Sequence, residues 1–144
     1  MNDPYFQPPV SNGNPYEQAL IRRWWTENQN RKGGLVWEYH IDGYYIDAVW
    51  FIDSADDGVE YPGVKTNSNF PIKDQNIVIC EAKLRLTPEL VGQALVYTEL
   101  ARRAGAKVKR TIVFYDEASP KMESVTAELG LDFERPTRAV ESDA

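Results

Sequence analysis

The chain has 144 residues, of which 42% are hydrophobic and 26% are charged. This length and composition predict one domain with a hydrophobic core of its own. The single cysteine excludes an internal disulfide framework and favours a reducing compartment. The net charge of −6 argues against a general nucleic-acid coat protein, because such proteins are usually basic.

The sequence gives no sign of membrane insertion or export. No apolar run approaches the roughly 18 residues of a membrane span, and no basic segment followed by an apolar one opens the chain. We therefore expect a cytoplasmic protein. The charge is unevenly spread, since residues 76–115 carry seven Lys or Arg against three Glu. A locally basic surface on an acidic chain is compatible with this distribution.

Residues 1–13 are rich in Pro, Asn and Gly and predict an irregular N-terminal arm. Residues 14–30 predict a helix, in which Asn14 suits the N-cap and Pro15 the first helical position. Glu17, at the third helical position, matches the acidic residue of a capping box. A globular domain is expected to begin at this helix.

Residues 35–52 predict a β-hairpin, because two aromatic and β-branched runs flank the dipeptide Asp42-Gly43. Residues 53–75 contain many Asp, Asn, Gly and Pro and predict a long loop. Residues 76–83 follow as a further strand, whose first half is a short apolar run.

The second half of the chain alternates helices and strands. Residues 87–105 and 119–130 each begin with a capping hydroxyl and Pro and end at Gly, which predicts two helices. Residues 107–116 and 131–135 predict strands, and the segment 136–144 predicts a loose tail. The strand–helix–strand passage implies a parallel pair beside the antiparallel hairpin. The prediction is an α/β fold with a mixed sheet, in a single domain spanning residues 14–135.

Two carboxylates occupy unusual places in these strands. Side chains alternate along a strand, so Glu81 and Lys83 share one face near its carboxyl end. In the second hairpin strand, Asp47 is a lone carboxylate on the face of Tyr45, Val49 and Phe51. An ionised carboxylate is costly to bury without a compensating cation or hydrogen bonds. One divalent metal ion could compensate both carboxylates.

Asp47 in one strand and Glu81-x-Lys83 ending the next resemble the signature of the PD-(D/E)XK nuclease superfamily. A preceding helix with Glu17 agrees with this pattern, and Gln93-x-x-x-Tyr97 in the following helix is similar to the motif of recombination-type and CRISPR-associated exonucleases. The element order over residues 14–135 agrees with the α-βββ-α-β core of that restriction-endonuclease-like fold. The literal Pro-Asp is absent, since Ile46 precedes the aspartate.

The resemblance implies that Asp47, Glu81 and the backbone carbonyl of Ala82 bind Mg²⁺ or Mn²⁺. Lys83 would orient the attacking water or neutralise charge on the phosphate, and Gln93 and Tyr97 would support the site from one helical face. Glu17 would bind the metal directly, bind it through water, or position a neighbouring group. These roles predict hydrolysis of phosphodiester bonds in nucleic acid, with DNA favoured.

Each candidate also has a purely structural interpretation. Glu81 and Lys83 could form an ion pair at the sheet's rim, and Asp47 could be exposed in a protruding hairpin. Glu17 could serve only the helix cap, and Tyr97 with Gln93 could belong to the core stripe of its helix. The corresponding alternative functions are a catalytically inactive module of the same fold that binds nucleic acid or protein, and an unrelated α/β protein.

Clusters of basic residues leave two interpretations open. Five positive charges fall within residues 102–110, and four more fall at Arg22, Arg23, Arg31 and Lys32. They either contact phosphates or form solvated surfaces. The sequence also leaves open the choice between endo- and exonucleolytic cutting, and a homodimer is one assembly that the resemblance allows.

Overall fold

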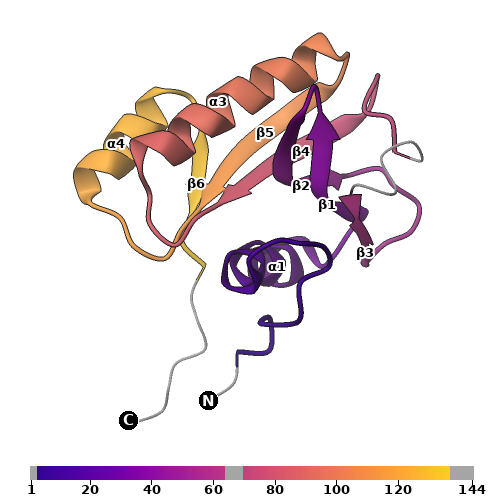
Figure 1. Ribbon diagram of the computed structural model, residues 1–144, viewed down its shortest axis with the longest axis horizontal. Helices are drawn as coiled ribbons and strands as arrows, with labels where there is room; N and C mark the ends of the chain where they lie inside the picture. The colour runs from indigo at the N-terminus through magenta and orange to yellow at the C-terminus, as the bar shows by residue number, and fades with distance from the viewer. Residues whose placement is uncertain (1–2, 64–69, 137–144) are drawn as a thin grey trace.

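A six-stranded mixed sheet forms the centre of the chain in this computed structural model, which describes residues 3–63 and 70–136 (Figure 1). The strands are β1 (Gly34–Ile41), β2 (Tyr44–Phe51), β3 (Val59–Pro62), β4 (Asn76–Ala82), β5 (Lys107–Phe114) and β6 (Asp132–Glu134). Their spatial order is β3-β1-β2-β4-β5-β6. The β1–β2 and β2–β4 pairs are antiparallel, and the β1–β3, β4–β5 and β5–β6 pairs are parallel. The predicted α/β class with a mixed sheet is confirmed.

The helices begin where the sequence predicts them. They are α1 (Pro15–Gln29), α3 (Pro88–Arg103) and α4 (Pro120–Glu128). Asn14, Thr87 and Ser119 cap them, each accepting a backbone N–H of the first turn through its side-chain oxygen. The β1–β2 hairpin turns at Asp42 and Gly43, whose φ angles of 49° and 85° are those of a type I′ turn.

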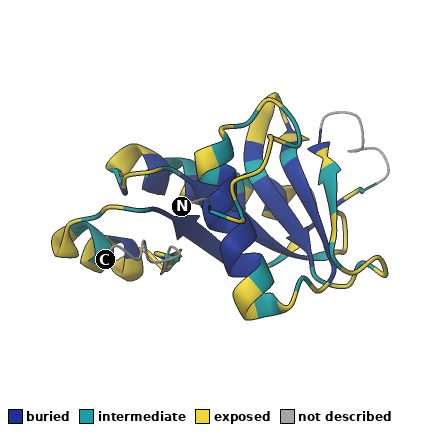
Figure 2. Ribbon diagram, turned by 90° about the horizontal axis from the view of Figure 1, so that it is seen from below, coloured by how far each residue is buried: buried dark blue, intermediate teal, exposed yellow. Residues whose placement is uncertain are grey.

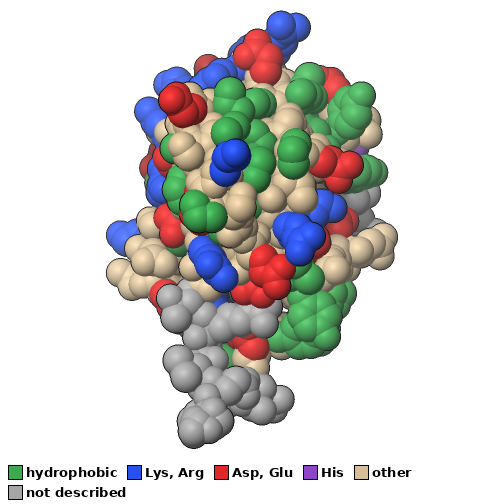
Figure 3. Space-filling view, turned by 90° about the vertical axis from the view of Figure 1, so that its left-hand side faces the viewer, with side chains coloured by type: hydrophobic (Ala, Val, Ile, Leu, Met, Phe, Trp, Pro, Cys, Tyr) green, Lys and Arg blue, Asp and Glu red, His purple; other side chains and the backbone are tan. Residues whose placement is uncertain are grey.

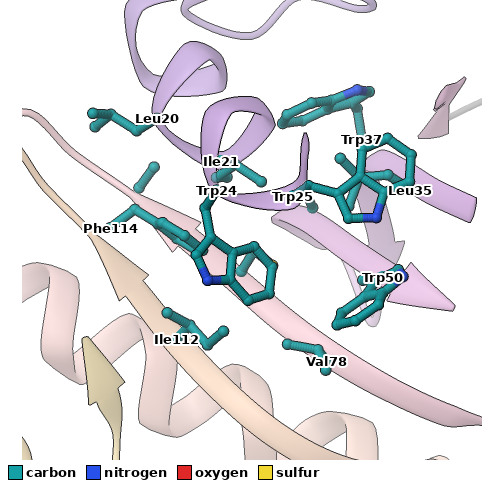
Figure 4. Packing of buried hydrophobic residues seen from close by; sticks show 13 residues of the cluster. Leu20, Ile21, Trp24, Trp25, Leu35, Trp37, Trp50, Val78, Ile112 and Phe114 are labelled. Atoms are coloured by element: carbon teal, nitrogen blue, oxygen red, sulfur yellow. The ribbon is translucent and has the colours of Figure 1, made fainter. Parts of the chain in front are cut away.

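Helices cover both faces of the sheet (Figure 1). On one face α1 packs against a cluster that contains all four tryptophans together with Val78, Ile112 and Phe114 (Figure 4). On the other face α3 covers Val49, Ile77 and Ile79, and α4 lies next to it over a third apolar cluster. Cys80 and the four tryptophans are buried in the cluster on the α1 face.

Helix α1 is buried over eight consecutive residues, Gln18 to Trp25 (Figure 2). The sheet covers its inner side, and residues 3–13 cover part of its outer side as an irregular segment, as predicted. Arg23 forms an ion pair with Asp3, 2.7 Å long, and Arg22 donates to the backbone oxygen of Tyr5. With 1% and 3% of their surfaces exposed, Arg22 and Arg23 are neither phosphate contacts nor part of a solvated surface.

Strand β3 corrects the expected loop over residues 53–75. Its Glu60 accepts hydrogen bonds from Arg22, Arg31 and the Trp37 indole. These bonds tie β3 to the outer edge of β1 as a parallel neighbour. The rest of the expected loop falls partly in residues 64–69, and the expected tail falls almost entirely in residues 137–144, both outside the described residues.

No helix in the described part of the chain has the length and apolar character needed to cross a membrane.

Candidate active site

The two carboxylates predicted to bind metal meet where β2 and β4 separate. Ladder pairing between these strands ends at Ala48 and Cys80. Beyond that point each strand uses a side chain to reach its neighbour. The amide of Asp47 donates to Oε2 of Glu81 over 2.7 Å, and the amide of Ala82 donates to Oδ2 of Asp47 over 2.8 Å. The two carboxylates are therefore held by reciprocal bonds to the opposite backbone.

The side-chain alternation of β2 breaks at Asp47. Val49 and Phe51 lie in the cluster on the α3 face, as expected, but Ile46 lies in that cluster too. Asp47 instead lines a small cavity on the α1 side with Ile21 and Trp37. The predicted shared face of Asp47 with Val49 and Phe51 is therefore wrong, because the strand changes faces between residues 46 and 48.

Burial and mutual repulsion make both carboxyl groups hard to ionise. Desolvation raises the pKa of Asp47 to about 7, against the opposing effect of the Ala82 amide. Desolvation and the charge of Asp47 raise the pKa of Glu81 well above its usual range. The exposed fraction of Glu81 is only 2%. Two such carboxyl groups favour a bound cation, since a cation removes the cost of holding both negative charges.

Glu17 extends the acidic character of the site from helix α1. It lines the same cavity of about 20 Å³ as Asp47 and Ala82. Burial raises the pKa of Glu17, and its charge raises the pKa values of Asp47 and Glu81. Asn14 caps the helix by accepting the Glu17 amide, so the helix cap does not by itself explain why the Glu17 carboxylate lies beside the cavity.

Lys83, which directly follows β4, influences all three carboxyl groups electrostatically. The positive charge of Lys83 lowers the pKa values of Glu17, Asp47 and Glu81, and the Lys83 amide donates to Phe114 of β5. In the described part of the chain Lys83 forms no ion pair with these carboxylates, so a simple rim ion pair with Glu81 is absent.

Tyr97 of α3 is half-buried and packs against the apolar cluster on the α3 side of the sheet. Burial first, and the charges of Glu81 and Asp47 next, raise the pKa of Tyr97. The Tyr97 ring also contacts that of Tyr44 in the hairpin, at 6.2 Å between centroids. Gln93 is half-buried one turn earlier on α3. Among the described residues no hydrogen bond joins Gln93 to the carboxylates, so its predicted supporting role stays a prediction.

A fourth acidic residue, Glu38 of β1, lines the cavity and was missed by the sequence analysis. Its charge raises the pKa of Asp47. The predicted hairpin could have identified Glu38, because a two-residue turn at Asp42 and Gly43 places it directly across from Asp47. The observed pairs on either side, Trp37 with Ala48 and Tyr39 with Ile46, follow that register.

The basic segment 102–110 lies at the other end of the sheet. Lys107 pairs with Asn76 at the start of β4, whereas Glu81 pairs with Val113. Five residues of strand separate the two positions along β4, roughly 16 Å at the usual rise. Arg103 and Arg110 are already paired with Glu99 and Asp132. This segment therefore does not surround the carboxylate pair.

Acidic and basic side chains are interspersed on the face that α4 presents, with apolar side chains between them (Figure 3). Among the residues described, this face offers no continuous basic surface of the kind that tracks a nucleic-acid backbone.

The donors suit a hard divalent cation. Mg²⁺ is commonly bound by one or two carboxylates together with water and substrate phosphate oxygens, and Asp47 and Glu81 each keep one carboxylate oxygen outside the two backbone bonds. In the described residues no group of three or more His, Cys, Asp or Glu side chains is arranged to hold a metal ion. Glu17 and Glu38 therefore contribute charge to the site without completing a third protein ligand.

Comparisons with models of known protein families, with curated proteins and with solved structures gave no match.

Proposed function

We propose that this protein is a divalent-metal-dependent nuclease of the PD-(D/E)XK type, with a restriction-endonuclease-like fold. One observation supports the proposal most strongly. At the carboxyl end of β4, two buried carboxyl groups each accept a backbone amide of the opposite strand, and the positive charge of Lys83 acts on both. Such a pair is unfavourable when ionised and becomes favourable when a cation bridges it. The element order and the position of Tyr97 support the same reading.

Each residue then has a defined task. Asp47 and Glu81 would hold Mg²⁺ or Mn²⁺, with the Ala82 carbonyl as a further oxygen donor. The bound metal would lower the pKa of a coordinated water and polarise the scissile phosphate. Lys83 places a fixed positive charge beside the pair, where an attacking water or a charged phosphate oxygen would lie. Tyr97 can donate its phenol proton to an oxygen at the same place, because its raised pKa keeps it protonated.

Phosphodiester bonds of nucleic acid, with DNA favoured, are the proposed substrate. The reaction needs no covalent intermediate on the protein: water adds to phosphorus and the sugar oxygen leaves. The site supplies charge and orientation for these two oxygens.

The test is cleavage of labelled single-stranded, duplex, flapped and four-way-junction DNA and of RNA, with Mg²⁺, Mn²⁺ or EDTA. Glu81→Gln keeps an acceptor for the Asp47 amide, and Lys83→Met keeps the length of the side chain. We expect metal-dependent cutting that falls by at least about 100-fold in both variants, the scale of a lost transition-state charge contact. Glu89→Gln and Lys121→Met, both exposed in the structure, are the matched controls.

Absence of cutting by the native chain, with DNA still bound in EDTA, would overturn this proposal in favour of an inactive binding module. Equal activity in Glu81→Gln and in Glu89→Gln would show that the pair is not the active site.

A further inference from the structure

The backbone of Glu38 is in a conformation that a glutamate rarely adopts. Its φ angle is 49°, in the left-handed region. The other non-glycine residues with positive φ in the described chain lie after a helix or in turns, at Asn30, Arg31, Asp42 and Asp74. Glu38 alone among them lies inside a β-strand. Outliers of this kind gather at functional sites, where the surrounding structure holds them in place.

The β1–β2 ladder is interrupted at this residue and at Asp47 opposite it. Pairing runs through Trp37 with Ala48 and resumes at Tyr39 with Ile46, but Glu38 and Asp47 themselves do not pair. The register is unchanged across the gap. The interruption is therefore a local turn of the backbone and not an inserted residue.

The freed amide of Asp47 is the one that Glu81 binds. Ile52 donates its amide to Asn76 beside β4, so in the part of β2 that leads from residue 52 back to Ala48 even-numbered residues direct their amides toward β4 and odd-numbered ones toward β1. By this alternation the Asp47 amide should bind the Glu38 carbonyl. Instead it donates to Oε2 of Glu81 on the opposite side.

Both hairpin strands change faces at the same place. Val36 lies on the α3 side and Trp37 on the α1 side, yet Tyr39 lies on the α3 side again. In β2, Val49 lies on the α3 side and Ala48 on the α1 side, yet Ile46 lies on the α3 side again. This change turns Glu38 and Asp47 together into the cavity beside α1.

Gly63 holds the Glu38 backbone in this position. A Cβ atom built on Gly63 would lie 2.3 Å from the Glu38 carbonyl oxygen and 1.8 Å from that of Trp37. Only a glycine allows the chain after β3 to approach β1 so closely. The Glu38 carbonyl thus faces Gly63 and not the Asp47 amide.

We propose that Glu38 is a positioning residue of the carboxylate pair, because its left-handed backbone withdraws Asp47 from the hairpin ladder and gives the Asp47 amide to Glu81. The change of acceptor for the Asp47 amide, from Glu38 to Glu81, is inferred from geometry alone. Its consequence for metal binding rests on the proposed function. This exchange explains how Asp47, a residue of the hairpin, comes to hold the Glu81 side chain in place through its own backbone amide.

The test separates backbone conformation from side-chain charge. Glu38→Gly removes the carboxylate but accepts positive φ freely, whereas Glu38→Val favours an extended backbone. His40→Val places the same residue in β1 at a position without positive φ and is the control. The position of the Asp47 amide in ¹⁵N–¹H spectra of metal-free protein is compared with that in Glu81→Ala, which removes the acceptor. Mn²⁺ affinity is measured on the same samples.

We expect Glu38→Gly and His40→Val to keep the native Asp47 amide position. In Glu38→Val the Asp47 amide should leave its native position, as it does when Glu81→Ala removes the acceptor, and Mn²⁺ affinity should fall by about tenfold or more, the scale for residues that orient ligands. A folded Glu38→Val chain with a native amide position would overturn the inference, as would loss of that position in Glu38→Gly.

If Glu38→Val does not fold, Glu38→Ala takes its place, with a shift of the Asp47 amide away from its native position expected and an unchanged position contradicting the inference. A native chain that binds no Mn²⁺ would overturn the proposed function, while the amide comparison would still decide the role of Glu38.

Discussion

Asp47 and Glu81 stabilise the fold when they are neutral and suit a cation when they are charged. Each accepts a backbone amide of the other strand, so each closes a gap that the separating strands leave open. The same burial that makes these bonds necessary raises both pKa values. Stability and the proposed metal binding would therefore depend on opposite protonation states of one pair.

The first prediction is that Asp47→Asn stabilises the metal-free protein at pH 8 but not at pH 4. The pKa of Asp47 is about 7 in the folded chain and about 3.9 when unfolded. The folded state therefore holds the proton more tightly, and the native chain loses stability as pH rises through this window. Asparagine keeps the amide acceptor and cannot ionise. At about 1.4 kcal/mol per pKa unit, the difference should reach roughly 2–4 kcal/mol.

Urea unfolding of both chains in EDTA, at several pH values, measures this difference. A gap between native and variant stability that does not change from pH 4 to pH 8 would contradict the raised pKa. Asp53→Asn, at an exposed aspartate, controls for the general loss of one negative charge.

The sequence predicted the ionisable residues of the site except Glu38, but it did not predict their geometry. The lone carboxylate of Asp47 and the pair Glu81 and Lys83 stand out because charges are rare in apolar strands. The position of Glu38 follows from the turn at Asp42 and Gly43. Its positive φ does not, because the backbone that packs against Glu38 at Gly63 comes from another part of the chain.

At the scale of the elements, β3 shows what a local pattern cannot predict. Its four residues, Val59–Pro62, include a glutamate and a proline and have no strand-like alternation. The strand exists because Glu60 binds Arg22 in α1 and Trp37 in β1. The other elements were predictable because their signals are local: capping residues, prolines and glycines at their ends, or a periodic pattern of apolar residues along them. An element stabilised by distant partners leaves no such signal.

The second prediction is that Glu60→Ala destabilises the protein by roughly 3–5 kcal/mol, the usual cost of leaving a buried charge without its partner. Arg22 is only 1% exposed and would lose its counter-ion. Burial opposes ionisation of Glu60, but its hydrogen bonds from Arg22 hold its pKa below the usual range. Urea unfolding should show a lower midpoint.

Glu99→Ala is the matched control for Glu60→Ala, since the Glu99–Arg103 pair lies at the surface and such pairs contribute little. Equal destabilisation by the two substitutions would show that β3 is not anchored through Glu60.

At the scale of the whole molecule, a cation at the carboxylate pair should stabilise the fold. A ligand that binds only the folded state contributes about 2.7 kcal/mol at a concentration one hundred times its dissociation constant. The third prediction is therefore a rise in melting temperature with Mn²⁺, larger at pH 8 than at pH 6 because protons compete for Asp47 and Glu81. The double variant Asp47→Asn, Glu81→Gln should show no rise; an equal rise in that variant would place the cation elsewhere.

The distribution of charge bears on the proposed binding of nucleic acid. The chain carries a net charge of −6, and Glu17 and Glu38 lie beside the carboxylate pair. The exposed lysines 107 and 109 are at the far end of the sheet. Without a cation, a phosphate near Lys83 would therefore face several negative charges at close range.

The last prediction is that metal-free native protein binds DNA more weakly than the double variant Asp47→Asn, Glu81→Gln. At pH 8, above the pKa of Asp47, the variant lacks negative charge that repels phosphate, whereas in Mg²⁺ the native chain would gain a bridging cation that the variant cannot hold. The order of affinities should reverse between EDTA and Mg²⁺. Fluorescence anisotropy with a labelled, non-cleavable phosphorothioate DNA at constant ionic strength measures both conditions. Affinities that keep the same order with and without Mg²⁺ would mean that DNA binds away from the pair, and the basic end of β5 would then be the surface to examine by Lys107→Glu and Lys109→Glu.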